Sequence, residues 1–319
     1  MPPRIFQRDI STYPLTSLTY GPSILIVLAR AIGKTPYARK YLWDRSMRKR
    51  ISLAQNNFRN PRLVASIVRA SSINKKDVVY EIGPGMGIIT HELVKVAKKI
   101  IVIEKDSNLV KKLRAKFENI NNVEIHEADF LKYRIENAKY KIFSNIPFNI
   151  TADIVRKILY GENQPEEAYL VMQKEAADKF SGEPVETQFS ILAKPWFSFS
   201  ILRTFKSTDF VPIPKVDVVL LHVEKRSRPL VSPEHAIIYQ RFVKHGFSAW
   251  KKHLKAAYKR IFTYVQWRRL SHNLHFPLTA TPTQLTFEQW LGLFNFFLKN
   301  IYKEKDTGFS RKTRDFQQI

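Results

Sequence analysis

The sequence contains no cysteine among its 319 residues. Disulfide bonds, zinc–thiolate sites and thiol nucleophiles are therefore excluded, and a reducing compartment such as the cytoplasm fits this composition. Long apolar runs are also missing. No stretch approaches the roughly 18 apolar residues of a membrane helix, so we expect no membrane span. The eight histidines show no metal-ligand spacing, and no metal site is predicted.

Acidic residues are scarce. The 28 Asp and Glu stand against 53 Lys and Arg, which gives a net charge of +25. Residues 1–50 carry 10 basic and 2 acidic residues, residues 51–224 carry 25 and 21, and residues 225–319 carry 18 and 5. The two flanks therefore predict surfaces that bind a polyanion. An anionic membrane surface is the weaker alternative, because the basic helices also have an apolar core face. We favour nucleic acid.

Apolar runs alternate with helical patterns through the middle of the chain. This alternation predicts a parallel, doubly wound sheet. Two further β-rich runs, 196–205 and 217–226, suggest a closing hairpin. The expected strands lie at 77–82, 100–106, 123–130, 139–148 and 167–173, and the expected helices at 88–99, 107–119 (capped by Ser107) and 152–160.

The pattern changes after Pro233. Residues 235–262 keep apolar side chains at helical spacing with lysines between them, and residues 286–302 begin with a capping box from Thr286 to Gln289. The last third of the chain is therefore expected to be a basic helical domain, with a boundary near 226–232.

A glycine turn, "EIGPGMG", follows the first strand and opens a helix. Gly83, Gly85 and Gly87 let the backbone approach a ligand and leave the helix N-terminus free to bind it. Glu104, at the end of the second strand, can accept hydrogen bonds from both ribose hydroxyls. Asp129 ends the third strand, where it could meet an adenine amino group.

Two other interpretations of this turn compete: a purely structural turn and a nicotinamide dinucleotide site. The spacing G-P-G-M-G is one residue tighter than G-x-G-x-x-G, and Pro84 stiffens it. A nucleoside ligand without a pyrophosphate, S-adenosyl-L-methionine, suits this tighter turn better.

The segment "FSNIPFNIT" places a proline corner at the carboxyl end of the fourth strand, where ligands bind in such sheets. An exocyclic adenine amine is a poor nucleophile because its lone pair is delocalised into the ring. The side-chain oxygen of Asn145 and the carbonyl of Ile146 can each accept one amine proton, and Pro147 restricts Ile146 to extended conformations. Phe148 offers a face on which the base can stack. A rigid turn with packed aromatics is the alternative.

With these residues in view, the chain resembles the ribosomal RNA adenine N6-methyltransferases, which include the Erm enzymes of large-subunit RNA and the KsgA-type enzymes of small-subunit RNA. The likeness covers roughly residues 52–300. "EIGPGMG", "IEKD", "EADF" and "SNIPFNIT" match in order and spacing, and "FVPIPKVD" resembles the family's F-x-P-x-P-x-V-D corner. "AQNNFRNP" is similar to the segment that closes over the cofactor, with Gln55 and Asn56 matching. The resemblance implies that Phe210 stacks on the opposite face of the target base.

The resemblance implies an S-adenosyl-L-methionine-dependent enzyme with an α/β fold: a Rossmann-like methyltransferase sheet with helices on both faces, and a small all-α C-terminal domain. We expect a basic extension at 1–50, the catalytic domain at 51–228, the helical RNA-binding domain at 229–303 and a charged tail at 304–319. We also expect a monomer in a bacterial cytoplasm.

The residues "PWF" at 195–197 and the ending "PTQLTFEQWLGLF" favour the Erm branch, which implies methylation of one adenine in large-subunit RNA and resistance to macrolides, lincosamides and streptogramin B. A KsgA-type dimethylase and a non-catalytic RNA-binding protein are the alternatives. The basic side chains expected to contact phosphates are Lys251, Lys252, Lys255, Lys259, Arg260, Arg268 and Arg269.

Overall fold

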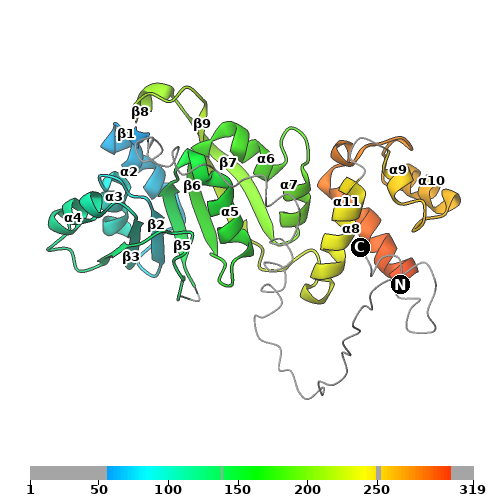
Figure 1. Ribbon diagram of the computed structural model, residues 1–319, viewed down its shortest axis with the longest axis horizontal. Coiled ribbons are helices and arrows are strands. Elements are labelled where there is room, and N and C mark those ends of the chain that lie inside the picture. Colours follow the sequence, from blue (N-terminus) through cyan, green and yellow to red (C-terminus); the bar gives the residue numbers. More distant parts are fainter. Residues whose placement is uncertain (1–55, 138, 249–252, 303–319) are drawn as a thin grey trace, which may run out of the picture.

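The fold is built on one twisted sheet of seven strands with helices on both faces (Figure 1). The computed structural model describes residues 56–137, 139–248 and 253–302. Five neighbouring strands are parallel, and β9 pairs antiparallel with both β6 and β7. In spatial order the strands are β4 (Val123–Glu127), β3 (Lys99–Glu104), β2 (Val78–Ile82), β5 (Lys141–Asn145), β6 (Glu167–Gln173), β9 (Val218–Lys225) and β7 (Phe197–Phe205).

Each face of the sheet has its own apolar core. One core joins α2, α3 and α4 to the sheet through Val64, Leu93 and Leu113, and the other joins α5 and α6 through Ile158 and Phe180. Strands buried on both faces read as continuous apolar runs, as in "KIIVIE" of β3. The helices are α2 (Pro61–Arg69), α3 (Ile88–Val96), α4 (Ser107–Lys116), α5 (Thr151–Tyr160), α6 (Lys174–Ser181) and α7 (Gln188–Ala193).

A separate aromatic core holds the C-terminal helices together. Trp267, Trp290 and Phe294 are buried there. The backbone carbonyl of Ile191 of α7, which belongs to this core, accepts a hydrogen bond from the Tyr239 hydroxyl (2.7 Å), so the helical region packs against the sheet region. The helices are α8 (Ala236–Ser248), α9 (Leu254–Ala257), α10 (Tyr264–Asn273) and α11 (Phe287–Phe297), followed by the turn Leu298–Tyr302.

Two predictions about helix limits were wrong. The N-cap of α4 is Asp106, which accepts from the backbone N–H of Asn108 (2.8 Å), and Ser107 is the first helical residue. The helical pattern at 235–262 is not continuous, because α9 ends at Ala257 and a new capping box, Thr263 with Gln266, starts α10. The expected capping box at the start of α11 is confirmed.

A second small sheet joins distant parts of the chain. β1 (Asn57–Phe58) pairs antiparallel with β8 (Phe210–Val211), and the backbone N–H of Arg59 donates to the carbonyl of Asp209 (2.8 Å). The segment that precedes α2 is therefore held against the corner between β7 and β9, the two strands expected as a closing hairpin.

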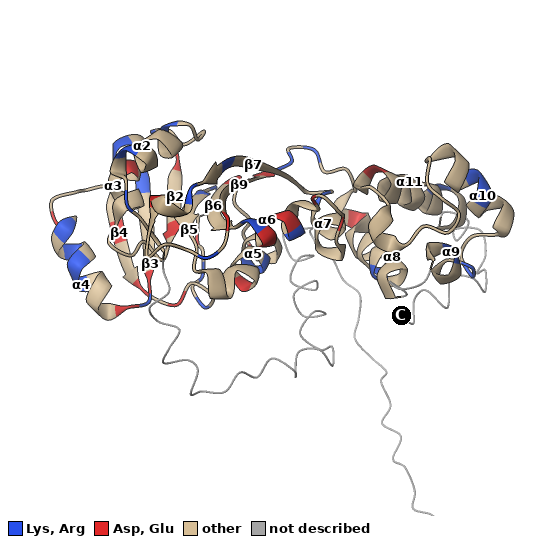
Figure 2. Cartoon of the chain, turned by 90° about the horizontal axis from the view of Figure 1, so that it is seen from above, with Lys and Arg blue, Asp and Glu red and all other residues tan. Residues whose placement is uncertain are grey.

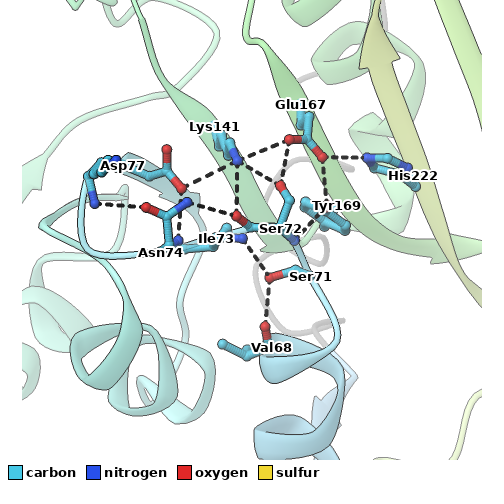
Figure 3. Close-up of polar contacts among 11 residues, drawn as sticks. Val68, Ser71, Ser72, Ile73, Asn74, Asp77, Lys141, Glu167, Tyr169 and His222 are labelled. Atoms are coloured by element: carbon cyan, nitrogen blue, oxygen red, sulfur yellow. Dashed lines mark hydrogen bonds and ion pairs between the residues drawn. The ribbon is translucent and has the colours of Figure 1, made fainter.

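A buried polar cluster lies at the amino-terminal ends of the parallel strands (Figure 3). The Lys141 ammonium, at the start of β5, lies 3.0 Å from Glu167 and 3.3 Å from Asp77, and its side chain is 8% exposed. Glu167 also accepts from the hydroxyl of Ser72 and pairs with His222 at 2.9 Å. This edge lies opposite the strand ends where ligands bind in parallel sheets, so we assign the cluster to stability.

Candidate active site

Three buried oxygen atoms in the described part of the chain have no hydrogen-bond partner: one on Glu81, one on Glu104 and Oδ1 of Asn145. Buried polar atoms normally find partners, so an unpaired acceptor is a candidate position for a bound ligand or water. All three residues lie at or next to the carboxyl ends of β2, β3 and β5, which are adjacent in the sheet. The unpaired acceptors therefore mark the edge at which the sequence predicted a nucleoside.

The glycine turn has the backbone that its sequence predicted. Gly83, Gly85 and Gly87 have φ values of 63°, 59° and 72°, in the left-handed region that favours glycine. A Cβ atom on Gly87 would lie 2.9 Å from side-chain atoms of Leu113 and Phe117, so close helix packing also requires this glycine. The backbone N–H of Gly83 donates to the carbonyl of Ile103 (2.9 Å), which joins the turn to the end of β3.

Glu104 is the last residue of β3, and one of its two carboxylate oxygens has hydrogen-bond donors while the other has none. Oε1 accepts from the backbone N–H groups of Lys105 (2.8 Å) and Asp106 (2.9 Å), which fixes the carboxylate. Oε2 is buried and unpaired, so it is left as an acceptor for a ribose hydroxyl. Asp129 differs, because its oxygens already accept from the Leu131 backbone (3.0 Å) and the Lys105 ammonium (2.9 Å).

Asn145, the last residue of β5, has a fixed amide orientation. Its Nδ2 donates to the backbone carbonyl of Asn56 (2.7 Å), and its Oδ1 is buried and unpaired. Since the donor end of the amide is occupied, the acceptor end is the part left for a substrate. Asn56 was predicted from the cofactor-closing motif, and that role stays a prediction; the structure shows that its backbone carbonyl orients the Asn145 amide. Gln55 lies outside the described residues.

Two hydroxyls that the sequence analysis missed hold the corner in place. The Ser144 hydroxyl donates to the carbonyl of Ile82 (2.5 Å) and accepts from its N–H (3.1 Å), which ties β5 to the start of the glycine turn. The Thr151 hydroxyl lies 3.2 Å from the carbonyls of both Pro147 and Phe148. Ser144 and Thr151 stand on either side of the proline corner in the sequence, and this position of two hydroxyl residues is the signal that could have predicted their role.

The two aromatic residues expected to stack on the base have different environments. Phe148 begins a short 3₁₀ turn (Phe148–Ile150) after Pro147 and is partly exposed. Phe210 is fully buried, and its ring centroid lies 4.7 Å from that of Phe58 and 5.7 Å from that of Phe205. In this conformation Phe210 offers no face to a base, and the prediction of a stacking role is corrected to a packing role because β1 covers the ring.

The predicted phosphate-binding residues lie in the helical region, away from the sheet edge. Lys255 is on α9, Lys259 and Arg260 follow it in a turn, and Arg268 and Arg269 are on α10; all five side chains are exposed. Lys251 and Lys252 lie outside the described residues. In the described ranges, no helix is long and apolar enough to cross a membrane.

Glu81 is a candidate functional residue that the sequence analysis did not select. Its Oε2 accepts from the Thr90 hydroxyl (2.6 Å) and its Oε1 is unpaired. Burial raises the pKa of this carboxyl to about 8, with Thr90 opposing the shift and the Glu104 charge adding to it. At neutral pH the carboxyl is therefore mostly protonated, and a nearby cation would ionise it.

The residues present fit S-adenosyl-L-methionine. The Glu104 acceptor suits a ribose hydroxyl, the glycine turn permits close approach because three of its residues lack a side chain, and the carboxyl of Glu81 suits the positive charge that this cofactor carries. When bound, S-adenosyl-L-methionine supplies an electrophilic methyl group.

A pH series on cofactor binding tests the assignment of Glu81. Because binding of a cation favours the ionised carboxyl, affinity should rise as pH increases from about 6 to 8 and level off above the pKa of about 8. Calorimetry at pH 7 in two buffers of different ionisation enthalpy should detect proton release. Glu81→Gln should remove the part of this release that the carboxyl provides, and an unchanged proton count would contradict the assignment.

Comparison with known proteins gives one consistent result. The family described as "Ribosomal RNA adenine dimethylase" matches residues 46–299. An "rRNA adenine N-6-methyltransferase" of Bacillus licheniformis is 28% identical over 255 residues, covering 79% of this chain and 88% of the relative. A "Ribosomal RNA small subunit methyltransferase A" of Clostridium perfringens is 30% identical over 219 residues, covering 66% of this chain and 76% of the relative.

Solved structures agree with this result. The 23S rRNA methyltransferase ErmE superposes with a TM-score of 0.72 at 26% identity, covering 76% of this chain and all of the other. A dimethyladenosine transferase from Plasmodium falciparum, at 24% identity and a TM-score of 0.60, shares the fold and covers 76% and 97% of the two chains. The predicted Rossmann-like methyltransferase fold is confirmed, and the chain belongs to the ribosomal RNA adenine dimethylase family of S-adenosyl-L-methionine-dependent N6-methyltransferases.

Proposed function

We propose that this enzyme methylates N6 of one adenine in 23S ribosomal RNA, and that Asn145 and Ile146 hold the reacting amine. The observation that carries the assignment of the site is the orientation of the Asn145 amide. Its Nδ2 is bound to the carbonyl of Asn56, so Oδ1 is presented as an acceptor beside the glycine turn.

The chemistry follows from how the amine is held. An adenine amine is planar and weakly nucleophilic while its lone pair is shared with the ring. Two fixed acceptors, Oδ1 of Asn145 and the carbonyl of Ile146, draw the two amine protons out of the ring plane and leave the lone pair on nitrogen. This is positional and electrostatic catalysis, and the proton leaves after attack, when the nitrogen is cationic.

The rest of the corner keeps these acceptors still. Pro147 restricts Ile146 to an extended conformation, and the backbone N–H of Ile146 donates to the carbonyl of Val171 (3.1 Å). The Thr151 hydroxyl contacts the next two carbonyls, and Phe148 provides a partly exposed ring for the base. A base in a helix must leave its stack to reach this corner.

Two observations support large-subunit RNA as the substrate. A solved structure named for this substrate, the 23S rRNA methyltransferase ErmE, superposes with a TM-score of 0.72 at 26% identity. The Pro195–Trp196–Phe197 turn that favours the Erm branch contributes to the junction with the helical region, where the Trp196 ring lies 5.8 Å from that of Tyr239. Methylation of the drug-binding adenine would give resistance to macrolides, lincosamides and streptogramin B.

The identity of the substrate is tested by labelling. The purified protein is incubated with radiolabelled S-adenosyl-L-methionine and either naked 23S or naked 16S ribosomal RNA, and the labelled base is mapped. We expect label at one adenine of 23S RNA. Label confined to a pair of adjacent adenines in 16S RNA would replace this proposal with a small-subunit dimethylase, which the 30% identity to the Clostridium perfringens enzyme makes the second candidate.

A further inference from the structure

The helical region presents one exposed aromatic side chain. Tyr264, at the start of α10, is 56% exposed, and no other aromatic residue in the described ranges is classed as exposed. Its neighbour Val265 is 75% exposed. Every other aromatic side chain described between residues 253 and 302 is buried or partly buried, so Tyr264 is the exception among the described aromatic residues of this region.

The helix does not need this ring for its own stability. The capping box of α10 is made by Thr263 and Gln266, and its core face is made by Trp267, Leu270 and Ser271. Tyr264 lies outside both groups. A single exposed apolar side chain is common on protein surfaces, so the case for a binding surface depends on what surrounds the ring.

The ring is held by a cation on one side. The Lys255 ammonium lies 4.4 Å from the centroid of the Tyr264 ring, at cation–π distance, which leaves the opposite face for a second planar group. Arg268 is four residues along α10 and is therefore on the same side of the helix as Tyr264. Tyr264 thus lies beside one positive charge, with a second on the same side of its helix.

The surrounding charge fits a polyanion. No Asp or Glu occurs between Glu234 and Glu288, whereas nine Lys or Arg do. Figure 2 shows this as basic positions on α9 and α10 without acidic ones on those helices. An exposed aromatic ring next to positive charges without acidic neighbours suits a ligand that has both flat bases and phosphates. Single-stranded nucleic acid has both, whereas an acidic protein has no base to stack on the ring.

We propose that Tyr264 is a stacking platform for one unpaired base of the RNA substrate, with Lys255 and Arg268 binding the adjacent phosphates. The inference rests on the proposed function in one respect, that the ligand is the RNA to be methylated. This platform would place a nucleotide contact on the helical region, apart from the adenine held at the corner after β5. It would therefore help to select RNAs that carry an unpaired nucleotide at a set distance from the target adenine.

Binding measurements on two RNAs test this platform. The ligands are a hairpin with one bulged purine and the same hairpin fully paired, titrated against the full chain at several salt concentrations. Tyr264→Ala should weaken binding of the bulged hairpin by about 5- to 150-fold, the range expected for one base stack, and change binding of the paired hairpin less than about twofold. Tyr264→Phe keeps the π-face and should bind as the unmodified protein does.

The salt dependence separates stacking from charge. Tyr264→Ala should leave the slope of log affinity against log salt unchanged, whereas Lys255→Gln should reduce it by about one. Val265→Ala is the matched control, because it is adjacent and more exposed but has no ring. Unchanged cofactor affinity and thermal unfolding show that the variants are folded.

Three results would overturn the platform. The first is an affinity of Tyr264→Ala for the bulged hairpin within about twofold of that of the unmodified protein. The others are an equal loss of affinity for both hairpins in Tyr264→Ala, or a loss in Tyr264→Phe as large as that in Tyr264→Ala. Competition by polyglutamate as strong as that by RNA would assign the surface to an acidic protein instead. None of these measurements uses methyl transfer, so a failure here is distinct from a failure of the proposed 23S specificity.

Discussion

Asn145→Ala is expected to lower the rate of methyl transfer by a factor of about 100 to 1,000 while cofactor affinity stays within a few fold. The substitution removes Oδ1, the fixed acceptor for one amine proton, and also removes the Nδ2 bond to the carbonyl of Asn56. The Glu104 carboxylate and the glycine turn remain, so the ligand contacts assigned to them are kept.

Single-turnover transfer to a ribosomal RNA fragment, measured beside calorimetric cofactor binding, checks this expectation. Asn149→Ala is the matched control, because Asn149 lies in the same corner but its side chain is exposed, and its rate should change less than about threefold. A rate for Asn145→Ala within tenfold of the unmodified enzyme would refute the amine-clamp mechanism, while parallel loss of cofactor binding would reassign Asn145 to that ligand.

Lys141→Met should cost about 2 to 4 kcal/mol of unfolding free energy. The ammonium is 8% exposed and pairs with Asp77 and Glu167, whose side chains are 15% and 16% exposed. Its removal takes the lysine counter-charge from two mostly buried carboxylates, of which Glu167 keeps its contact with His222, and this is more costly than loss of a surface pair. Urea unfolding at pH 7 measures the difference.

Lys179→Met is the control for this stability prediction. Its pair with Glu175 has a similar distance, 2.8 Å, but both side chains are exposed, so the expected cost is below about 1 kcal/mol. Equal costs for the two variants would show that the cluster in Figure 3 behaves as an ordinary surface network.

Acid should weaken the same cluster. Burial on its own would raise the pKa of Glu167, but hydrogen bonds from Ser72, Tyr169, Lys141 and His222 lower it to about 2. Because this folded-state pKa lies below the ordinary value of 4.5, the stabilisation is present above about pH 4.5 and is lost as pH falls toward 2. The difference in unfolding free energy between Lys141→Met and the unmodified protein should therefore become smaller as pH falls from about 4.5 toward 2.

The fold was predictable because its signals are local. Apolar runs of five to seven residues, each followed by a helical pattern, predict a parallel sheet from the chain alone, as β3 and α4 show. The glycine turn was predictable for the same reason, since glycine tolerates the positive φ values of a tight turn and three glycines in five residues indicate such a turn. Glu104 and Asn145 could be placed because the ends of parallel strands share one edge.

What could not be predicted depends on contacts between distant residues. The bond from Asn145 to Asn56 spans 89 positions, and the partners of Lys141 are 26 or more positions away in the chain. Burial of Phe210 likewise results from β1 packing over it, which no pattern within "FVPIPKVD" indicates. Glu81 was missed because its raised pKa comes from enclosure by the sheet, and sequence alone does not report enclosure.

The pairing of β1 with β8 has a consequence for how activity is lost on partial unfolding. This two-residue ladder closes a loop of more than 150 positions, so it gains little from local contacts and is expected to open before the seven-stranded sheet does. Opening it would release the Asn56 carbonyl from Asn145 and uncover Phe210 together. Heat or denaturant should therefore inactivate the enzyme at a milder condition than the one that melts its secondary structure.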